Sequence, residues 1–364
     1  MFNNCFKGKK VLVTGNTGFK GSWLSLWLLE LGADVYGLAN GIPTNPSMYK
    51  VLGLSDKINH YDADVRDYEQ VKKIIQEVAP DFIFHLAAQS IISRSYEDPL
   101  ETISTNVIGT SVVLEALRCF ENECVAIIIT SDKCYDNFEW EWGYREIDHL
   151  GGKDLYSGSK ASAEIICNSF VNSFFNNNNN NVRIATARAG NVIGGGDWTK
   201  DGIVSDCMKA WGQGKPADIR SPKATRPWQH VLEPLSGYLR LAQVLNETDS
   251  LNGESFNFGP RSQNNHTVID LLNDLSKYWD LSHEPYRILE DVSFHEAGLL
   301  KLNCDKAIFH LDWRATMGYE DTTKFTSDWY NHYYFGTIDM ADFTLSQIIE
   351  YENIAKQWGN KWSL

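Results

Sequence analysis

Short apolar runs alternate with longer helical stretches through the first half of the chain. The runs with strand character are 10–14, 34–38, 58–61, 81–86, 125–130 and 183–187. Between them, helical patterns cover 22–31, 68–78, 99–120 and 157–175. Strands that alternate with helices of this length form a parallel sheet that is covered on both faces. The pattern therefore predicts an α/β protein with a doubly wound parallel sheet.

The alternation ends near residue 195. Beyond it come loops rich in Gly, Pro and Trp, a helical pattern near 234–245 and an aromatic tail. We expect a main domain over 1–197, to which 225–260 return, and a smaller mixed α/β substrate-binding lobe made of 198–224 and 261–364. The asparagine run 176–181 disfavours helix and strand, and it predicts an exposed loop.

Composition and charge narrow the class of partner. The formal net charge of −14 argues against nucleic acid or an anionic membrane surface as a partner. The densest apolar helical pattern, 22–31, is far shorter than the ~20 residues that a membrane span needs. Seven scattered cysteines without a Cys/His cluster predict no metal site and a reducing compartment, so we expect a cytoplasmic protein.

A glycine-rich turn follows the first strand. It has G-x-x-G-x-x-G spacing and contains Gly15, Thr17, Gly18, Phe19 and Gly21. Such glycines permit a tight turn and let the backbone approach a pyrophosphate at the N-terminus of the next helix. A lone glycine pattern also fits an ordinary strand-to-helix turn. Here the apolar strand before it and the apolar helix after it favour a Rossmann-type dinucleotide site.

The residues that would bind the adenosine half of a dinucleotide are less conventional. The second strand does not end in the carboxylate that usually holds the ribose of NAD, and it offers only Asn40. No arginine stands there for the phosphate of NADP, so these residues do not choose between the two cofactors. Asp64, which precedes Val65 after the third strand, either accepts from the adenine amino group or caps the next helix.

Tyr156 and Lys160 form a Y-x-x-x-K pair on a predicted helix. Side chains at i and i+4 share one helix face, and an ammonium beside a phenol lowers the phenol pKa from its usual value of about 10. Tyr156 is therefore a candidate base for a hydroxyl whose carbon loses hydride. The spacing also occurs by chance on solvated helices, but its place after a complete dinucleotide domain favours the catalytic interpretation.

Ser131, Asp132 and Lys133 follow the strand 125–130, at the sheet edge where ligands bind in this architecture. This position favours Ser131 as a hydrogen-bond partner of a substrate oxygen and Asp132 as a proton donor to a leaving hydroxyl. Lys133 is either a base for a carbon-bound proton, if its pKa is lowered, or a solvated turn residue.

Together these segments resemble the extended short-chain dehydrogenase/reductases over nearly the whole chain. The general signs are the three glycines, the segment 85–89 (HLAAQ), Asn106 and the Tyr156/Lys160 pair. Five more specific segments resemble the sugar-nucleotide 4,6-dehydratases of this family: 14–28 (TGNTGFKGSWLSLWL), 130–135 (TSDKCY), 142–146 (WGYRE), 190–198 (GNVIGGGDW) and 225–235 (TRPWQHVLEPL).

The resemblance implies a recycled, tightly bound NAD, a nucleotide-sugar substrate and a homodimer. In that chemistry the sugar is oxidised at C4 with Tyr156 as base, loses water across C5 and C6, and takes the hydride back at C6. The further cofactor positions that it implies are Leu86, Ala87, Ala88 and Asn106. The substrate positions that it implies are Gln89, Ser131, Arg188, Asn191, Arg226 and His230. For the arginines a surface ion pair, and for His230 a place in the core, are the alternatives.

One difference within the group bears on the substrate. The dTDP-glucose dehydratases carry Thr-Asp-Glu where this chain has Ser131-Asp132-Lys133. An amine in place of the carboxylate is found in the branch that acts on CDP-D-glucose, so the resemblance implies that substrate. One alternative is a nucleotide-sugar 4-epimerase or reductase, which needs Tyr156 and Lys160 but not the pair at 132 and 133. The other is a non-catalytic nucleotide-sugar binding protein, which the intact motifs do not favour.

Overall fold

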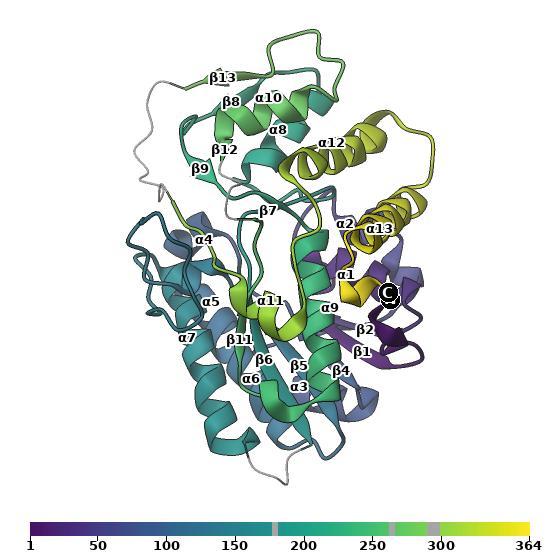
Figure 1. Cartoon of the computed structure of the whole chain (residues 1–364), viewed down its shortest axis with the longest axis vertical. Helices are drawn as coiled ribbons and strands as arrows, with labels where there is room; N and C mark the ends of the chain where they lie inside the picture. Colours follow the sequence, from purple (N-terminus) through teal and green to yellow (C-terminus); the bar gives the residue numbers. More distant parts are fainter. Residues whose placement is uncertain (177–180, 262–265, 290–298) are drawn as a thin grey trace.

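The computed structural model describes residues 1–176, 181–261, 266–289 and 299–364. A main domain built on a seven-stranded sheet occupies the lower part of Figure 1, and a lobe of short strands and helices lies above it. Most of the asparagine run, 177–180, lies outside the described residues, so the predicted loop stays a prediction.

The seven strands of the main sheet are all parallel to their neighbours. They are β1 (Lys10–Thr14), β2 (Asp34–Ala39), β3 (Asn59–Asp62), β4 (Phe82–His85), β5 (Cys124–Ile129), β6 (Val182–Arg188) and β11 (Ser255–Asn257). Their order is β3-β2-β1-β4-β5-β6-β11. From β1 the chain first adds strands toward one edge of the sheet and then, starting with β4, toward the other edge. Doubly wound sheets bind ligands at this switch point. The predicted fold class is therefore confirmed.

Helices cover both faces of the sheet, and the strands bury side chains on each. Along β1, Val11 and Val13 face one apolar layer and Leu12 faces the other. The first layer includes α1 (Phe19–Glu30) and α9 (Leu232–Glu247), and the second includes α3 (Tyr68–Val78), α6 (Gly109–Arg118) and α7 (Leu155–Phe170). Burial on both faces explains why the central strands are continuous apolar runs, whereas the edge strand β3 is polar and largely exposed.

Two of the predicted helices contain π-helical turns, one in the middle and one at the C-terminal end. The pattern over 99–120 forms α5 (Pro99–Ile103), a π-helical turn (Ser104–Ile108) and α6. The pattern over 157–175 forms α7 and a second π-helical turn (Val171–Phe175). Two short helices, α2 (Met48–Val51) and α4 (Ile92–Glu97), complete the first half of the chain.

The lobe is assembled from strands of two or three residues that pair across long stretches of sequence. Its elements are α8 (Ile203–Gly212), β8 (Ala217–Ile219), β9 (Thr225–Arg226), β12 (His266–Thr267), α10 (Val268–Ser276), β13 (Tyr286–Ile288) and α12 (Tyr319–Phe335). β8 pairs in parallel with β13, and β9 pairs antiparallel with β12. A parallel pair of β7 (Val192–Ile193) and β10 (Gln229–His230) connects the lobe to the main domain.

The end of the chain returns to the main domain. α11 (Asp305–Leu311) contacts β11 and α9, and α13 (Met340–Gln357) contacts α1. After α13, Trp362 stacks on Phe2 with 5.0 Å between ring centroids and on Tyr351 with 5.7 Å. This differs from the expectation that 261–364 belong to the lobe, because the aromatic tail buries its rings against the N-terminal segment and α1.

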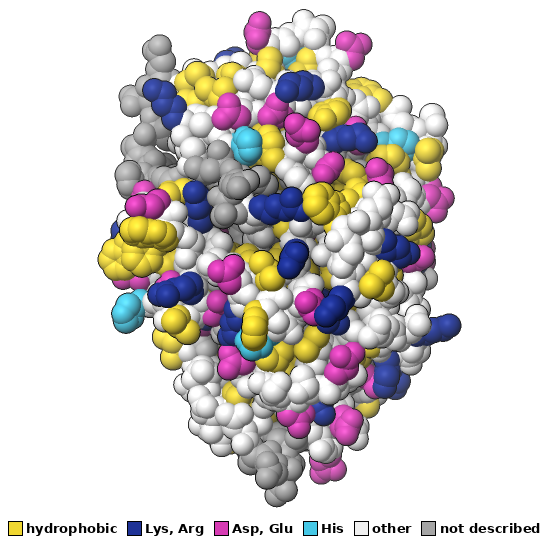
Figure 2. Space-filling view, in the orientation of Figure 1, with side chains coloured by type: hydrophobic (Ala, Val, Ile, Leu, Met, Phe, Trp, Pro, Cys, Tyr) yellow, Lys and Arg dark blue, Asp and Glu magenta, His cyan; other side chains and the backbone are white. Residues whose placement is uncertain are grey.

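The surface carries charges of both signs. On the face drawn in Figure 2, acidic and basic side chains are interspersed among polar and apolar ones. Within the described ranges, no helix combines the length and the apolar character that crossing a membrane requires.

Candidate active site

A cavity of about 1660 Å³ runs from the glycine-rich turn, past the carboxyl ends of the central strands, to β8 and β13 of the lobe. Sites for one drug-sized ligand measure roughly 300–1,000 Å³, so this cavity has room for two nucleotides. It is lined by the predicted residues Gly15, Thr17, Gly18, Phe19, Gly21, Asn40, Asp64, Val65, Leu86, Ala87, Ala88, Gln89, Ser131, Asp132, Lys133, Tyr156, Lys160, Asn191 and Arg226. Three other predicted residues, Asn106, Arg188 and His230, lie behind its wall.

The glycine-rich turn leaves no room for side chains at two of its positions. Gly15 has a φ of +72°, and a Cβ there would lie 2.7 Å from the Ala87 nitrogen. A Cβ on Gly21 would lie 2.2 Å from the Gly15 oxygen, so α1 packs directly on the turn. α1 begins at Phe19, and its N-cap Gly18 supplies no side chain to the first N–H groups. Free N–H groups at the start of a 12-residue helix suit a pyrophosphate.

Asn40 and Asp64 are bonded to each other on the cavity wall. Asn40 Nδ2 donates to Asp64 Oδ2 at 2.9 Å, and Arg66 Nε donates to Asp64 Oδ1 at 2.9 Å. The hydrogen bonds from Arg66, with smaller help from Asn40, lower the pKa of Asp64 to about 2. The alternative that Asp64 caps the next helix is wrong. Asp67 caps α3 instead, because its carboxylate accepts from the Gln70 nitrogen at 3.1 Å.

Asn106 supports the cavity wall from behind. Its Oδ1 accepts from the Gln89 nitrogen at 2.8 Å, and its Nδ2 donates to the Gln89 oxygen and to Ser159 Oγ, each at 2.9 Å. The side chain of Gln89 is itself bonded, because its Nε2 donates to Thr102 Oγ1 at 2.8 Å. Asn106 therefore ties the segment after β4 to α7, in place of the direct cofactor contact that the sequence predicts.

Tyr156 and Lys160 lie on the first two turns of α7 and face the cavity. Asp154 caps this helix, since its carboxylate accepts from the Ser157 nitrogen at 2.9 Å. Lys160 Nζ reaches the end of β5 and donates to the Ile129 oxygen at 3.5 Å. The two side chains are 8% and 6% exposed, so they meet a ligand only inside the cavity.

Burial dominates the titration of both groups. It raises the pKa of Tyr156, against the hydrogen bond with Ser131, which lowers it. Burial and the nearby charge of Lys20 lower the pKa of Lys160 to about 8. The net pKa of Tyr156 is therefore raised and not lowered as the sequence predicts, because the loss of hydration of the phenolate and the charge of Asp132 outweigh the influences that favour ionisation.

Ser131, Asp132 and Lys133 turn out of β5 into the cavity. Ser131 Oγ donates to Asp132 Oδ1 at 3.0 Å and accepts from the Lys133 nitrogen at 3.2 Å. The other carboxylate oxygen, Asp132 Oδ2, accepts from Asn191 Nδ2 at 3.3 Å. Gly190 makes room for this carboxylate, because a Cβ there would lie 1.8 Å from Oδ2. The arrangement places a carboxylate, an amine and the Tyr156 phenol around one space.

Two predicted substrate residues are part of the interior. Arg188 is 2% exposed, and its Nη2 donates to Glu164 Oε2 at 2.8 Å. His230 lies between Trp23 and Phe325, with ring centroids at 5.8 and 5.6 Å, and burial lowers its pKa to about 3. The expectation of substrate contact for these two side chains is therefore replaced by a buried ion pair and a neutral core histidine.

Several cavity residues were missed by the sequence interpretation. Lys20, in the first turn of α1, and Asp197 line the cavity, and burial lowers the pKa of Lys20 to about 8. The sequence could have indicated Lys20, because it is a cation within the otherwise uncharged glycine-rich turn that is predicted to bind phosphate. In the lobe, Lys215, Arg220 and Arg287 also line the cavity. Their segments form strands too short to leave a recognisable pattern.

The comparisons with known proteins agree with this geometry. Residues 12–326 match the family described as GDP-mannose 4,6 dehydratase. The chain is 44% identical over 352 residues to CDP-glucose 4,6-dehydratase of Salmonella typhimurium, covering 96% of this chain and 97% of that one. An epimerase structure from Methanothermobacter thermautotrophicus superposes with a TM-score of 0.77, at 23% identity over 91% of this chain and 94% of that one. A dTDP-glucose 4,6-dehydratase structure from Streptomyces venezuelae gives 0.75, at 20% identity over 88% and 96%.

Proposed function

The chain belongs to the GDP-mannose 4,6-dehydratase family, within the extended short-chain dehydrogenase/reductases, and we propose that it dehydrates CDP-D-glucose to the 4-keto-6-deoxy sugar nucleotide. It is a hydro-lyase that uses NAD internally, so the reaction releases one water and leaves no net reduced cofactor. The 44% identity to a CDP-glucose 4,6-dehydratase over nearly the full length of both chains supports this choice of substrate.

The observation that carries the proposal is the meeting of two sets of groups in one cavity. Tyr156 and Lys160 suit oxidation at a hydroxyl-bearing carbon. Asp132 and Lys133 add an acid and a base, which elimination of water requires and simple oxidation does not. A 4-epimerase needs the first set alone, so the second set favours the dehydratase.

NAD fits the glycine-rich end of the cavity. Gly15 packs closely on Ala87 and Gly21 on Gly15, so the turn is tight, and the free N–H groups at the start of α1 suit a pyrophosphate. Asn40 and Asp64 would hold the adenosine, and Arg66, the cation beside them, is already neutralised by Asp64. This compensation supports NAD over NADP. When bound, NAD would supply the hydride acceptor for oxidation at sugar C4 and the hydride donor for C6.

The proton transfers are assigned to side chains of the chain itself. Tyr156 takes the proton of the 4-hydroxyl, and the ammonium of Lys160 stabilises the phenolate that this transfer requires. Lys133 removes the proton from C5, which the 4-ketone has made acidic. Asp132 donates a proton to the 6-hydroxyl, which departs as water. A proton then returns to C5, so the sugar loses water without net oxidation.

The test is incubation of the purified protein with CDP-glucose without added reductant, followed by mass spectrometry and by the alkaline absorbance of the keto sugar. We expect the loss of one water and no net reduced cofactor. An unchanged mass with a new 4-epimer would replace the proposal with the epimerase. Parallel reactions with dTDP-, UDP- and GDP-sugars rank the nucleotide, and titration with NAD and NADP ranks the cofactor.

We propose a cytoplasmic homodimer for the enzyme. The seven cysteines are unpaired, which suits a reducing compartment. Helices α5 and α6 lie against α7, and this group of helices exposes Leu100, Ile108 and Ile165, at 75%, 50% and 54%. A second copy of the same surface would bury these side chains around a twofold axis. Light scattering should give twice the chain mass, and Leu100→Asp with Ile165→Asp should give monomers. A monomeric wild type would contradict this assembly.

A further inference from the structure

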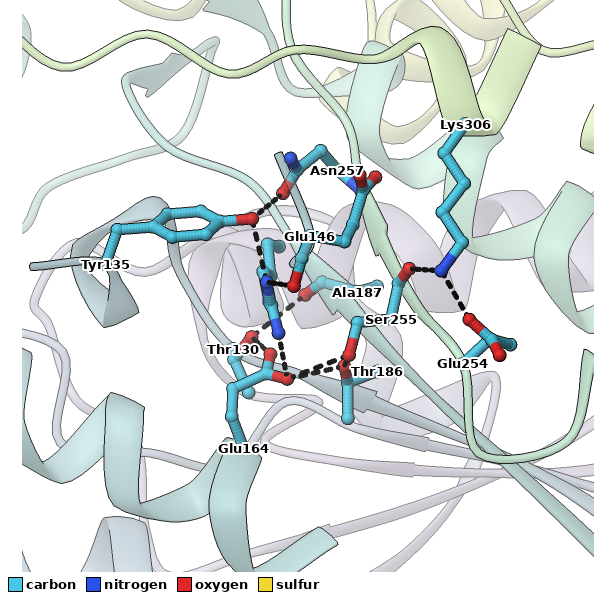
Figure 3. Close-up of polar contacts among 11 residues, drawn as sticks. Thr130, Tyr135, Glu146, Glu164, Thr186, Ala187, Glu254, Ser255, Asn257 and Lys306 are labelled. Carbon is cyan, nitrogen blue, oxygen red and sulfur yellow. Dashed lines mark hydrogen bonds and ion pairs between the residues drawn. The ribbon is translucent and has the colours of Figure 1, made fainter. Parts of the chain in front are cut away.

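One buried carboxylate joins the catalytic helix to the sheet. Glu164 lies on α7 one turn after Lys160, and it is 3% exposed. Figure 3 shows that its two oxygens accept from side chains on β6 and β11 and directly after β5, three strands that neighbour one another at this edge of the sheet. The donors are Thr130 Oγ1, directly after β5, Thr186 Oγ1 on β6 at 2.8 Å, Arg188 Nη2 on β6 at 2.8 Å and Ser255 Oγ on β11 at 3.2 Å.

Arg188 extends this network toward the segment that follows the catalytic turn. Its Nη1 donates to the Tyr135 hydroxyl at 2.7 Å and to the Glu146 oxygen at 3.1 Å. The Tyr135 hydroxyl in turn donates to Asn257 Oδ1 at 2.8 Å, and the guanidinium lies 5.0 Å from the centre of the Tyr135 ring. Hydrogen bonds therefore hold both the Glu164 carboxylate and the Arg188 guanidinium.

Each segment that supplies a reacting group has a neighbour in this network. Thr130 comes directly before Ser131 and Asp132, and Tyr135 comes three residues after Asp132. Glu164 is one turn from Lys160 and two turns from Tyr156 along the same helix face. Arg188 leads into Gly190 and Asn191, which contact the Asp132 carboxylate.

A purely structural role would not require charge here. Buried ion pairs are weak contributors to stability, and apolar side chains of similar volume often replace them without loss. A charged pair with several directed hydrogen bonds does fix distances and angles more narrowly than apolar packing. This contrast points to a role in geometry.

We propose that Glu164 and Arg188 form a positioning pair, which holds Tyr156 and Lys160 in register with Asp132 so that oxidation at C4 and elimination at C5 and C6 proceed from one bound orientation of the sugar. The inference rests on the proposed dehydratase function and assigns to Arg188 a task other than binding diphosphate. Neither side chain touches the substrate.

The pair also acts on the charge of Lys160. The groups that face Lys160 are Lys20 from α1, His85 from β4, Cys134 after β5, and Glu164 and Cys167 on its own helix. Among them, the negative charge of Glu164 raises the pKa of Lys160, against burial and Lys20. Glu164→Gln should therefore move the alkaline limb of the kcat profile to lower pH.

The test compares four proteins with CDP-glucose as substrate. For Glu164→Gln we expect kcat to fall about 100-fold, the effect of a misplacement of about 1 Å, with the KM within about threefold of wild type. The double variant Glu164→Leu with Arg188→Met removes both charges, so its melting temperature should recover while kcat stays low. Arg183→Met is the matched control. Arg183 lies on β6, as Arg188 does, but it forms its ion pair with Asp249 outside the cavity. Its replacement should therefore leave kcat unchanged.

Three results would overturn the positioning role. One is recovery of kcat together with the melting temperature in the double variant. Another is a loss of kcat in Glu164→Gln that is fully explained by a smaller fraction of folded protein. The third is an unchanged pKa of Lys160 in Glu164→Gln, measured by competitive acetylation and peptide mass spectrometry, which needs no turnover. A wild type that forms no keto sugar from any nucleotide sugar would instead contradict the proposed function, and the acetylation result would still decide the effect of Glu164 on Lys160.

Discussion

Gly190→Ala offers a direct test of how strictly the position of Asp132 is set. A Cβ at residue 190 would lie 1.8 Å from Asp132 Oδ2, 2.0 Å from Cγ and 2.3 Å from Oδ1. Contacts below 3.0 Å do not persist, so the carboxylate must retreat by at least about 1 Å. It is 3% exposed and bonded to Ser131 and Asn191, and it therefore cannot move without losing those bonds.

The expected cost follows from this displacement. A shift of about 1 Å in a reacting group lowers kcat by about 100-fold, which corresponds to about 2.7 kcal/mol of activation free energy. The effect should be confined to elimination, because Tyr156 and Lys160 lie on a different element. In stopped-flow measurements the reduced nicotinamide absorbance should therefore rise as in wild type and decay about 100-fold more slowly.

Gly158→Ala is the matched control, since this glycine lies on α7 and a Cβ added there would meet nothing within 4 Å. Alanine is a better helix former, so the variant should keep wild-type kcat and gain up to about 1 kcal/mol in free energy of unfolding. Wild-type kcat and normal decay in Gly190→Ala would show that elimination does not depend on the observed place of the Asp132 carboxylate.

Three further outcomes are expected. Gly15→Ala should weaken NAD binding at least about 10-fold by calorimetry, because its φ of +72° and its contact with Ala87 both oppose a side chain. The kcat should fall as the pH rises through about 8, where Lys160 loses its proton, and Lys20→Met should move this limb to higher pH by removing a neighbouring cation. Burial raises the pKa of Glu233 from 4.5 to about 7, so its contribution to stability is full below pH 4.5 and is lost as the pH rises through 7. Between pH 4.5 and 7 the free energy of unfolding of the wild type should fall by about 3 kcal/mol through this group, and urea unfolding of Glu233→Gln should not show that fall.

The main sheet could be predicted because its strands are buried on both faces. The central strands are nearly continuous apolar runs, whereas 58–61 is mostly polar and forms the edge strand β3, and each of the six predicted strands agrees with the structure within two residues at either end. The sequence pattern did not predict β11, because Ser255–Asn257 is only three residues long and forms a strand only through its pairing with β6. The lobe strands were missed for the same reason. β9 and β12 are two residues each and are joined only by tertiary contact.

The candidate site shows a similar division between local and tertiary information. The glycine-rich turn, the Tyr156/Lys160 pair and the 131–133 turn are local, since backbone geometry and helix periodicity bring their side chains to the same side. The pKa of Tyr156 is not local. It depends on burial and on Asp132, which is 24 positions away in the chain, so spacing to Lys160 alone predicted the wrong direction.

Arg188 shows why a motif identifies a segment more reliably than a side chain. In an extended strand, residues two apart point to the same face, and Thr186 and Arg188 both bond Glu164 on α7. The backbone then leaves the extended geometry, with a φ of +53° at Asn191, and this change turns the Asn191 side chain to the cavity. The alternation of side-chain direction along β6 therefore places Arg188 on the face of the sheet that α7 covers. This alternation ends before Asn191. The same parity argument implies that exchanging Arg188 for lysine should disturb kcat through α7 and leave the affinity for the nucleotide diphosphate unchanged.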